Sequence, residues 1–300
     1  MYLNILLGTM EQGLLWSLMV LGIYLTYRVL DYADLTVESS FTMGAAVAAR
    51  LIFDGLDPVL ATMIAIFAGA IAGVITGILH TQFQIAPLLS GILSMIALYS
   101  INLRIMGKAN ISLLRMDTVV SKISEIGVPE KWAVLVMGLF VSGLVIFLLW
   151  AFLNTEIGFA MRATGDNAQM IRSLGVNTNV MKVIGLSLSN ALVALSGALV
   201  AQYQSFADVG MGIGTIVVGL ASVIIGEVLF GTKTIMGTLI AVALGSLVYR
   251  IVVAGVLQMG LNPNDLRLLT ALIVTLALAS PILKRKIQSM MAARKGEENA

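Results

Sequence analysis

Few residues in this sequence have side chains that could carry out chemistry. The 300 residues include no cysteine and a single histidine, His80, which excludes a thiolate site, a disulfide framework and a multi-histidine metal cluster within the chain. No GxSxG turn accompanies His80, so a Ser-His-Asp triad is not predicted either. We therefore expect no catalytic residue and no metal site.

The segment from Gly226 to Thr234 comes closest to a cofactor motif, because it approaches the phosphate-binding loop GxxxxGK[ST]. Its lysine, Lys233, is displaced by one residue, and its glycines end an apolar segment instead of following a soluble strand. The sequence therefore predicts no ATP site and no cofactor in this chain.

The elements that must hold these residues are membrane helices. Hydrophobic residues make up 59% of the chain and charged residues 11%, against roughly 25% charged residues in soluble domains. The net charge of +2 is too small to favour nucleic acid as a partner. We expect an all-α polytopic helix bundle in membrane lipid, with a transmembrane domain at 1–283 and a basic tail at 284–300.

Apolar stretches near the roughly 20 residues needed to cross a bilayer define the predicted spans. Eight are clear and a ninth, at 37–53, is short, so the sequence predicts 8–9 transmembrane helices including one short broken helix. The eight lie at 10–30, 58–79, 86–106, 132–153, 183–206, 212–230, 235–257 and 266–283.

Three carboxylates stand at the entry to the short ninth span, on Asp31, Asp34 and Glu38. Charges so close to a span are costly unless they face water, protein or the membrane surface. We predict a broken helix that lines a cavity here, and an interfacial loop with solvated acids is the alternative. Two of these acids belong to the predicted translocation path, together with one serine of the short span and two polar residues of a later span. The path comprises Asp34, Glu38, Ser40, Asn190 and Gln202.

Small residues inside the spans predict close helix packing. Gly69, Gly73 and Gly77 share one helical face, which lets two backbones approach each other. Ser187 and Ser196 are expected to donate back to carbonyls of their own helix. The glycine run at 210–214 predicts a flexible start for the next span.

The longest polar interruption in the second half of the chain, residues 154–182, predicts a short helix between two spans. The tripeptide at 165–167 is typical of a helix start, residues 168–174 fit a short helix, and Gly175 is typical of a helix end. Asn177 then predicts the start of the next span. A plain structured loop is the alternative.

Basic residues determine the predicted orientation. The tail after Leu283 carries five of them, so we expect the C-terminus in the cytoplasm. Counting spans places the 154–182 loop on the same side, and it places the N-terminus and the 107–131 loop on the extracytoplasmic side. The 107–131 loop is long enough to hold a small surface helix.

The run from Gly158 to Leu199 resembles the cytoplasmic loop and following span of permease subunits of bacterial ABC importers, in the branched-chain amino acid and ribose permease family. Two further stretches are similar to that family: 34–40 with Gly44, and 218–240. The resemblance covers about residues 15–283. Residues 209–227 look closer to a branch of amino-acid importers, some associated with tryptophan or other aromatic amino acids. In the loop and the span, the shared residues are Gly158, Arg162, Ala163, Gly165, Asn167, Gly175, Lys182, Ser196 and Gly197.

The resemblance implies a membrane subunit that translocates a small solute, such as tryptophan or another aromatic amino acid, across the bacterial plasma membrane. It implies a second permease copy, as a homodimer or heterodimer, together with two cytoplasmic ATPase subunits that hold ATP and Mg and an extracytoplasmic solute-binding protein. It also implies that residues 168–174 form a coupling helix that docks on the ATPase. The coupling residues are Arg162, Gly165, Asp166, Asn167, Met170, Ile171, Arg172, Leu174 and Gly175.

The local chemistry of the 168–174 helix permits this docking. Met170 or Ile171 can share an apolar face with Leu174, with Arg172 as a charge at the rim of that face. Gly165 and Gly175 are then expected to act as hinge and stop.

Two other classes of protein remain open. In a stand-alone secondary transporter or channel, Asp34, Glu38 and Glu227 would be ion-coupling carboxylates. An intramembrane enzyme is disfavoured, because the sequence lacks a catalytic constellation.

Overall fold

Helices make up most of the chain in the computed structural model, which describes residues 2–125, 127–231 and 233–258 together with residues 268, 271, 272 and 275. They follow the apolar stretches of the sequence, because a membrane interior requires backbone polar groups to bond within each segment. The described helices are α1 (Tyr2–Tyr24), the π-helical turn η1 (Leu25–Val29), α2 (Thr36–Phe53), α3 (Pro58–Thr81), α4 (Pro87–Met106), α5 (Val119–Glu125), α6 (Glu130–Leu153), α7 (Glu156–Ser173), α8 (Thr178–Gln204), α9 (Thr215–Phe230) and α10 (Ile235–Gln258).

Six described segments are long and apolar enough to cross a membrane, and they match six of the predicted spans. They are Ile5–Val29, Pro58–Thr81, Pro87–Met106, Lys131–Leu153, Thr178–Gln204 and Ile235–Gln258. The stretch at 212–230 forms the shorter helix α9, and the stretch at 37–53 forms the more polar helix α2. The all-α polytopic bundle is thus confirmed. The total of 8–9 spans stays a prediction, because most of 266–283 and the whole tail 284–300 lie outside the described residues.

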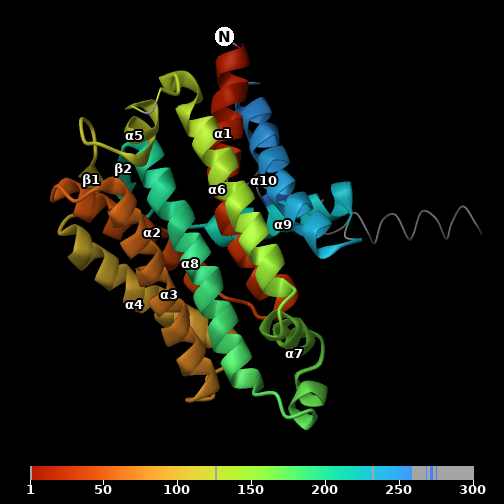
Figure 1. Ribbon diagram of the computed structural model, residues 1–300. Coiled ribbons are helices and arrows are strands. Elements are labelled where there is room, and N and C mark those ends of the chain that lie inside the picture. Colours follow the sequence, from red (N-terminus) through yellow and green to blue (C-terminus); the bar gives the residue numbers. More distant parts are fainter. Residues whose placement is uncertain are drawn as a thin grey trace, which may run out of the picture.

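Helix α8 is the centre of the bundle and packs on α1, α2 and α3 (Figure 1). Glycines permit this contact: a Cβ atom at Gly73 would lie 2.2 Å from Leu186 O, and one at Gly69 would lie 2.5 Å from Asn190 O. The predicted role of the glycine face of α3 in close packing is confirmed.

The serines of α8 bond to neighbouring helices, so the expectation that they bond to their own helix is wrong. Ser187 Oγ donates to Ala70 O on α3 at 3.1 Å, and Ser196 Oγ donates to Leu15 O on α1 at 2.7 Å. The physical reason is the close approach of the helices, which brings foreign carbonyl groups within reach of short side chains.

A small antiparallel sheet joins two loops that are far apart in the sequence. Strand β1 (Asn110–Ser112) pairs with β2 (Phe206–Asp208), with Ile111 opposite Ala207. The sheet was not predicted, whereas the small helix expected in the 107–131 loop is present as α5. The sheet and α5 lie at one end of the bundle and α7 at the other (Figure 1). Which end faces the cytoplasm stays a prediction.

Candidate functional site

The chain breaks between α1 and α2, beside the predicted acids. After the π-helical turn η1, residues 31–34 have no regular structure, and α2 begins at Thr36. Asp34 is only 2% exposed, and its Oδ1 accepts from Thr36 N at 2.9 Å, which satisfies a free amide at the start of α2. The break is confirmed. The alternative of solvated acids holds for the exposed Asp31 but is wrong for Asp34.

Asp34 and Asn190 meet in a buried polar cluster. Asn190 Nδ2 donates to Asp34 Oδ2 at 2.7 Å and to Leu186 O at 2.9 Å, which ties the break to α8. Asn190 Oδ1 has no hydrogen-bond partner among the described residues. Nearby, Thr76 Oγ1 lies 2.9 Å from Thr36 Oγ1 and donates to Ser94 Oγ at 2.7 Å. Four helices therefore meet at one buried polar centre.

Glu38 lies one turn further along α2 and contacts the glycine loop before α9. Its Oε1 accepts from Gly214 N at 2.9 Å, and Thr42 Oγ1 accepts from Gly212 N at 3.1 Å. A Cβ atom at Gly212 would lie 1.9 Å from Glu38 O, so only glycine allows the loop to lie so close to α2. The glycine run is thus a tight contact with α2 as well as the start of a helix.

The remaining predicted path residues are buried in other parts of the bundle. Ser40 is fully buried, and its Oγ has no partner in the described part of the chain. Gln202, near the other end of α8, donates to Thr62 Oγ1 at 2.8 Å and accepts from Val119 N at 2.9 Å. The structure thus joins Asp34 to Asn190 but leaves Gln202 apart from them. Their assignment to a solute path stays a prediction.

Helix α7 has a kink at Asn167, where φ is −155° and ψ is 90°. Asn167 Oδ1 accepts from Met170 N at 2.9 Å and so caps the second half of the helix. That half ends at Ser173, and Gly175 follows with a φ of +87°. The predicted start and end of this short helix are confirmed, but the preceding helical half, 156–166, was missed. Its signal was Thr155, whose Oγ1 accepts from Gly158 N at 3.2 Å as an N-cap.

Only two of the three apolar residues of the predicted coupling helix are exposed. Met170 is 57% exposed and Leu174 is 68% exposed, but Ile171 is only 7% exposed. Arg172 is also engaged within the chain, because its Nε donates to Thr178 Oγ1 at 2.7 Å. The alternative of a face shared by Ile171 and Leu174 is therefore wrong, whereas Met170 and Leu174 are both exposed. Arg172 is exposed and bonds only neutral groups of this chain, so its pairing with a partner carboxylate stays a prediction. Asp166 is exposed next to the kink.

Gly165 is a contact point and not a hinge, since the non-helical residue is Asn167. A Cβ atom at Gly165 would lie 2.1 Å from Val29 O in η1. Three residues earlier, the Arg162 guanidinium lies over the Phe159 ring at 4.6 Å, and its Nε has no partner among the described residues. The expected hinge at Gly165 is corrected, and α7 instead rests directly on the π-helical turn before the break.

Two polar pairs near this end of the bundle were not foreseen from the sequence. Arg28 in η1 binds both carboxylate oxygens of Glu227, with Nε 2.8 Å from Oε1 and 3.0 Å from Oε2. Lys182 Nζ lies 3.0 Å from His80 Nε2. Because Glu227 is paired with a cation, it is a poor candidate for an ion-coupling carboxylate.

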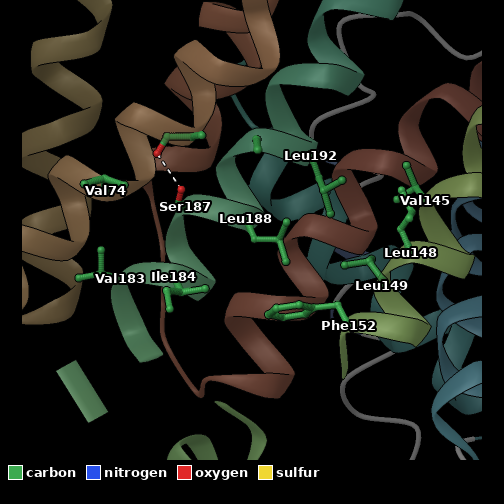
Figure 2. Close-up of a pocket in the computed structure, with 12 residues that line it drawn as sticks. Val74, Val145, Leu148, Leu149, Phe152, Val183, Ile184, Ser187, Leu188 and Leu192 are labelled. Atoms are coloured by element: carbon green, nitrogen blue, oxygen red, sulfur yellow. Dashed lines mark hydrogen bonds between the residues drawn. The ribbon is translucent and has the colours of Figure 1, made fainter. Parts of the chain in front are cut away.

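A cavity of about 500 Å³ lies between α3, α6 and α8 (Figure 2). Its only polar side chain is Ser187, whose hydroxyl is bound to Ala70 O, as Figure 2 shows. A polar solute would find no partner there, so this cavity suits apolar chains only. Its remaining lining residues are Ala70, Val74, Val145, Leu148, Leu149, Phe152, Val183, Ile184, Leu188, Ala191 and Leu192.

Comparisons with known proteins agree with the membrane architecture. A family model described as "Branched-chain amino acid transport system / permease component" matches residues 5–279. The sequence is 44% identical to a "Tyrosine transport system permease protein" of Clostridioides difficile, over 92% of this chain and 90% of that protein. It is 36% identical to an uncharacterised protein of Rickettsia prowazekii, over 93% and 98% of the two chains.

A more distant similarity links the chain to permeases of autoinducer 2 import systems. An "Autoinducer 2 import system permease protein LsrC" of Yersinia pseudotuberculosis is 28% identical, over 69% of this chain and 58% of that protein. No solved structure matches the chain.

Proposed function

Because the chain belongs to the family of permease components of branched-chain amino acid transport systems, we propose that it is the membrane subunit of an ATP-driven importer for an aromatic amino acid. The observation that carries the solute class is the 44% identity, over nearly the whole chain, to a tyrosine transport system permease protein. The described residues include no group of three or more potential metal ligands.

The proposal includes partners that supply energy and solute. Two ATPase subunits hold ATP and Mg at the cytoplasmic side, and a binding protein delivers the amino acid at the other side. A second permease copy completes the path, because alternating access requires two halves that move against each other.

The α7 end of the bundle is the proposed docking surface for the ATPase. Met170 and Leu174 are exposed apolar side chains on a helix of about two turns, which is too short to be stable alone in water. Helix α7 touches η1 through Gly165 and Val29. A push on the second half of α7 would pass through the kink at Asn167 to Gly165 and then to η1. The break that follows η1 carries Asp34 and leads to Glu38.

The test is uptake in proteoliposomes that contain the assembled importer. Labelled tyrosine or tryptophan should accumulate only when ATP is present on the side of the membrane where the ATPase subunits lie and the binding protein is present on the opposite side. Leu174→Ala should reduce uptake about 5- to 150-fold, as expected for the loss of about 1–3 kcal/mol at an interface anchor. Leu114→Ala is the matched control, because Leu114 is equally exposed, at 71%, but lies beside the sheet.

The two variants separate docking from general damage. The Leu174→Ala permease should insert and unfold like the wild type while its ATPase activity no longer responds to solute. Normal coupled uptake in Leu174→Ala, or an equal loss in Leu114→Ala, would contradict the docking assignment.

A further inference from the structure

A second cavity, of about 420 Å³, lies between α2, α4 and the 209–214 loop. This volume falls within the roughly 300–1,000 Å³ typical of small-molecule pockets. Unlike the apolar cavity in Figure 2, it contains a carboxylate. The residues that line it are Glu38, Ser39, Thr42, Met95, Ile96, Tyr99, Ser100, Val209 and Ile213.

Glu38 gives this cavity a negative charge that no cation among the described residues pairs with. One carboxylate oxygen accepts from Gly214 N, and none of the described ion pairs includes Glu38. The hydroxyls of Ser39 and Thr42 are already bonded, to Met95 O at 2.8 Å and to Glu38 O at 3.2 Å. A partly buried carboxylate with a free oxygen and no counter-ion favours a cationic ligand that can donate hydrogen bonds.

Much of the remaining lining of the cavity is apolar and exposed. Ile96 and Tyr99 on α4 are 59% and 49% exposed, and Ile213 in the glycine loop is 63% exposed. An aromatic ring and two branched side chains offer a surface on which a second ring can pack edge-on or offset. The cavity thus combines a carboxylate with aromatic and aliphatic side chains.

We propose that this cavity is a solute site within the permease, where Glu38 binds the α-ammonium group of an amino acid and Ile96, Tyr99 and Ile213 contact its aromatic side chain. The inference rests on the proposed function and deepens it, because it places recognition of the solute in the membrane subunit as well as in the binding protein. The 209–214 loop and α2 form the charged end together. Any movement of α9 against α2 therefore changes the site.

The test measures binding of labelled tyrosine to the purified permease–ATPase complex without the binding protein. Glu38→Gln keeps an oxygen that can accept from Gly214 N but removes the charge. It should weaken tyrosine binding roughly 10- to 150-fold, the range for losing a charge-assisted hydrogen bond. Unlabelled 3-(4-hydroxyphenyl)propionate lacks the ammonium group, so it should compete much less than unlabelled tyrosine at the wild-type complex.

Exposed residues of α4 provide a second variant and its control. Tyr99→Ala should weaken binding of tyrosine more than binding of alanine, and because Tyr99 is 49% exposed the change removes only part of a buried side chain. Ile101 is on the same helix, is 42% exposed and does not line the cavity, so Ile101→Ala should bind tyrosine like the wild type.

The outcomes distinguish this site from the proposed function. Wild-type tyrosine affinity in Glu38→Gln, equal competition by the analogue without the ammonium group, or no binding without the binding protein would each overturn the site. If the wild-type complex still imports tyrosine in those cases, the proposed function stands. A complete importer that moves no aromatic amino acid would refute the proposed function itself.

Discussion

Replacing Gly73 by alanine adds one methyl group where α3 crosses α8. The new Cβ atom would lie 2.2 Å from Leu186 O and 2.7 Å from Ser187 Cα. Both are backbone atoms, so neither can rotate away. Leu186 O also accepts from Asn190 Nδ2, and a displaced carbonyl would therefore disturb the bond between Asn190 and Asp34.

The magnitude follows from the size of this overlap. Carbon atoms in contact lie about 3.5–4.0 Å apart, so the two helices must separate locally by about 1 Å. Overpacking of this kind costs about 1–3 kcal/mol of the free energy of unfolding. The helix preference of alanine over glycine, about 1 kcal/mol in water, opposes that cost. Gly143→Ala in α6 is the matched control, because it gains the same preference and no atom lies within 4 Å of its new Cβ.

The assay compares thermal unfolding of the two variants in the same detergent, together with transport by the assembled importer. Gly73→Ala should be less stable than Gly143→Ala by about 1–3 kcal/mol, because the preference for alanine cancels in the difference. We expect transport to fall in Gly73→Ala alone. Equal unfolding midpoints would refute the reasoning, since they would mean that the α8 backbone moves away from the added methyl group without a cost in stability.

Three further outcomes are expected. Asn167→Ala removes the cap on Met170 N and should destabilise the second half of α7 by about 1 kcal/mol, seen as faster amide exchange at 168–173; unchanged exchange would contradict the capping role. Arg28→Ala leaves the 12%-exposed Glu227 without its cation, so it should lower the unfolding midpoint more than Arg50→Ala, which breaks an exposed pair; equal midpoints would count against a structural role for the first pair. Glu38→Cys should react with a water-soluble thiol reagent faster than Ser40→Cys, and equal rates would mean that the α2–α4 cavity is closed to water.

The features that the sequence predicted correctly depend on residues close to one another in the chain. The helix start capped by Asn167 and the helix end before Gly175 are local, because each uses backbone groups within three residues. The glycine face of α3 follows from helical periodicity alone. Asp34 was expected near a break because a carboxylate beside a span requires a polar partner.

The features that were missed depend on contacts between distant parts of the chain. Ser187 bonds to Ala70, which is 117 residues away, and no local pattern marks that carbonyl. Ile171 was assigned to an exposed face because its spacing fits, but packing inside the protein buries it. The β1–β2 sheet has three residues in each strand, which is too short for a recognisable alternation of polar and apolar residues.

The π-helical turn at Leu25–Val29 makes the number of residues in this segment a constraint of its own. Leu30 N donates to Leu25 O, five residues back, so this turn holds one residue more than an α-helical turn. Each residue of an α-helix rotates the next by about 100°. Deleting one residue here would let the α-helix continue but would swing Val29 O away from Gly165. Relatives of this chain should therefore exchange residue types within the turn more readily than they gain or lose a residue in it.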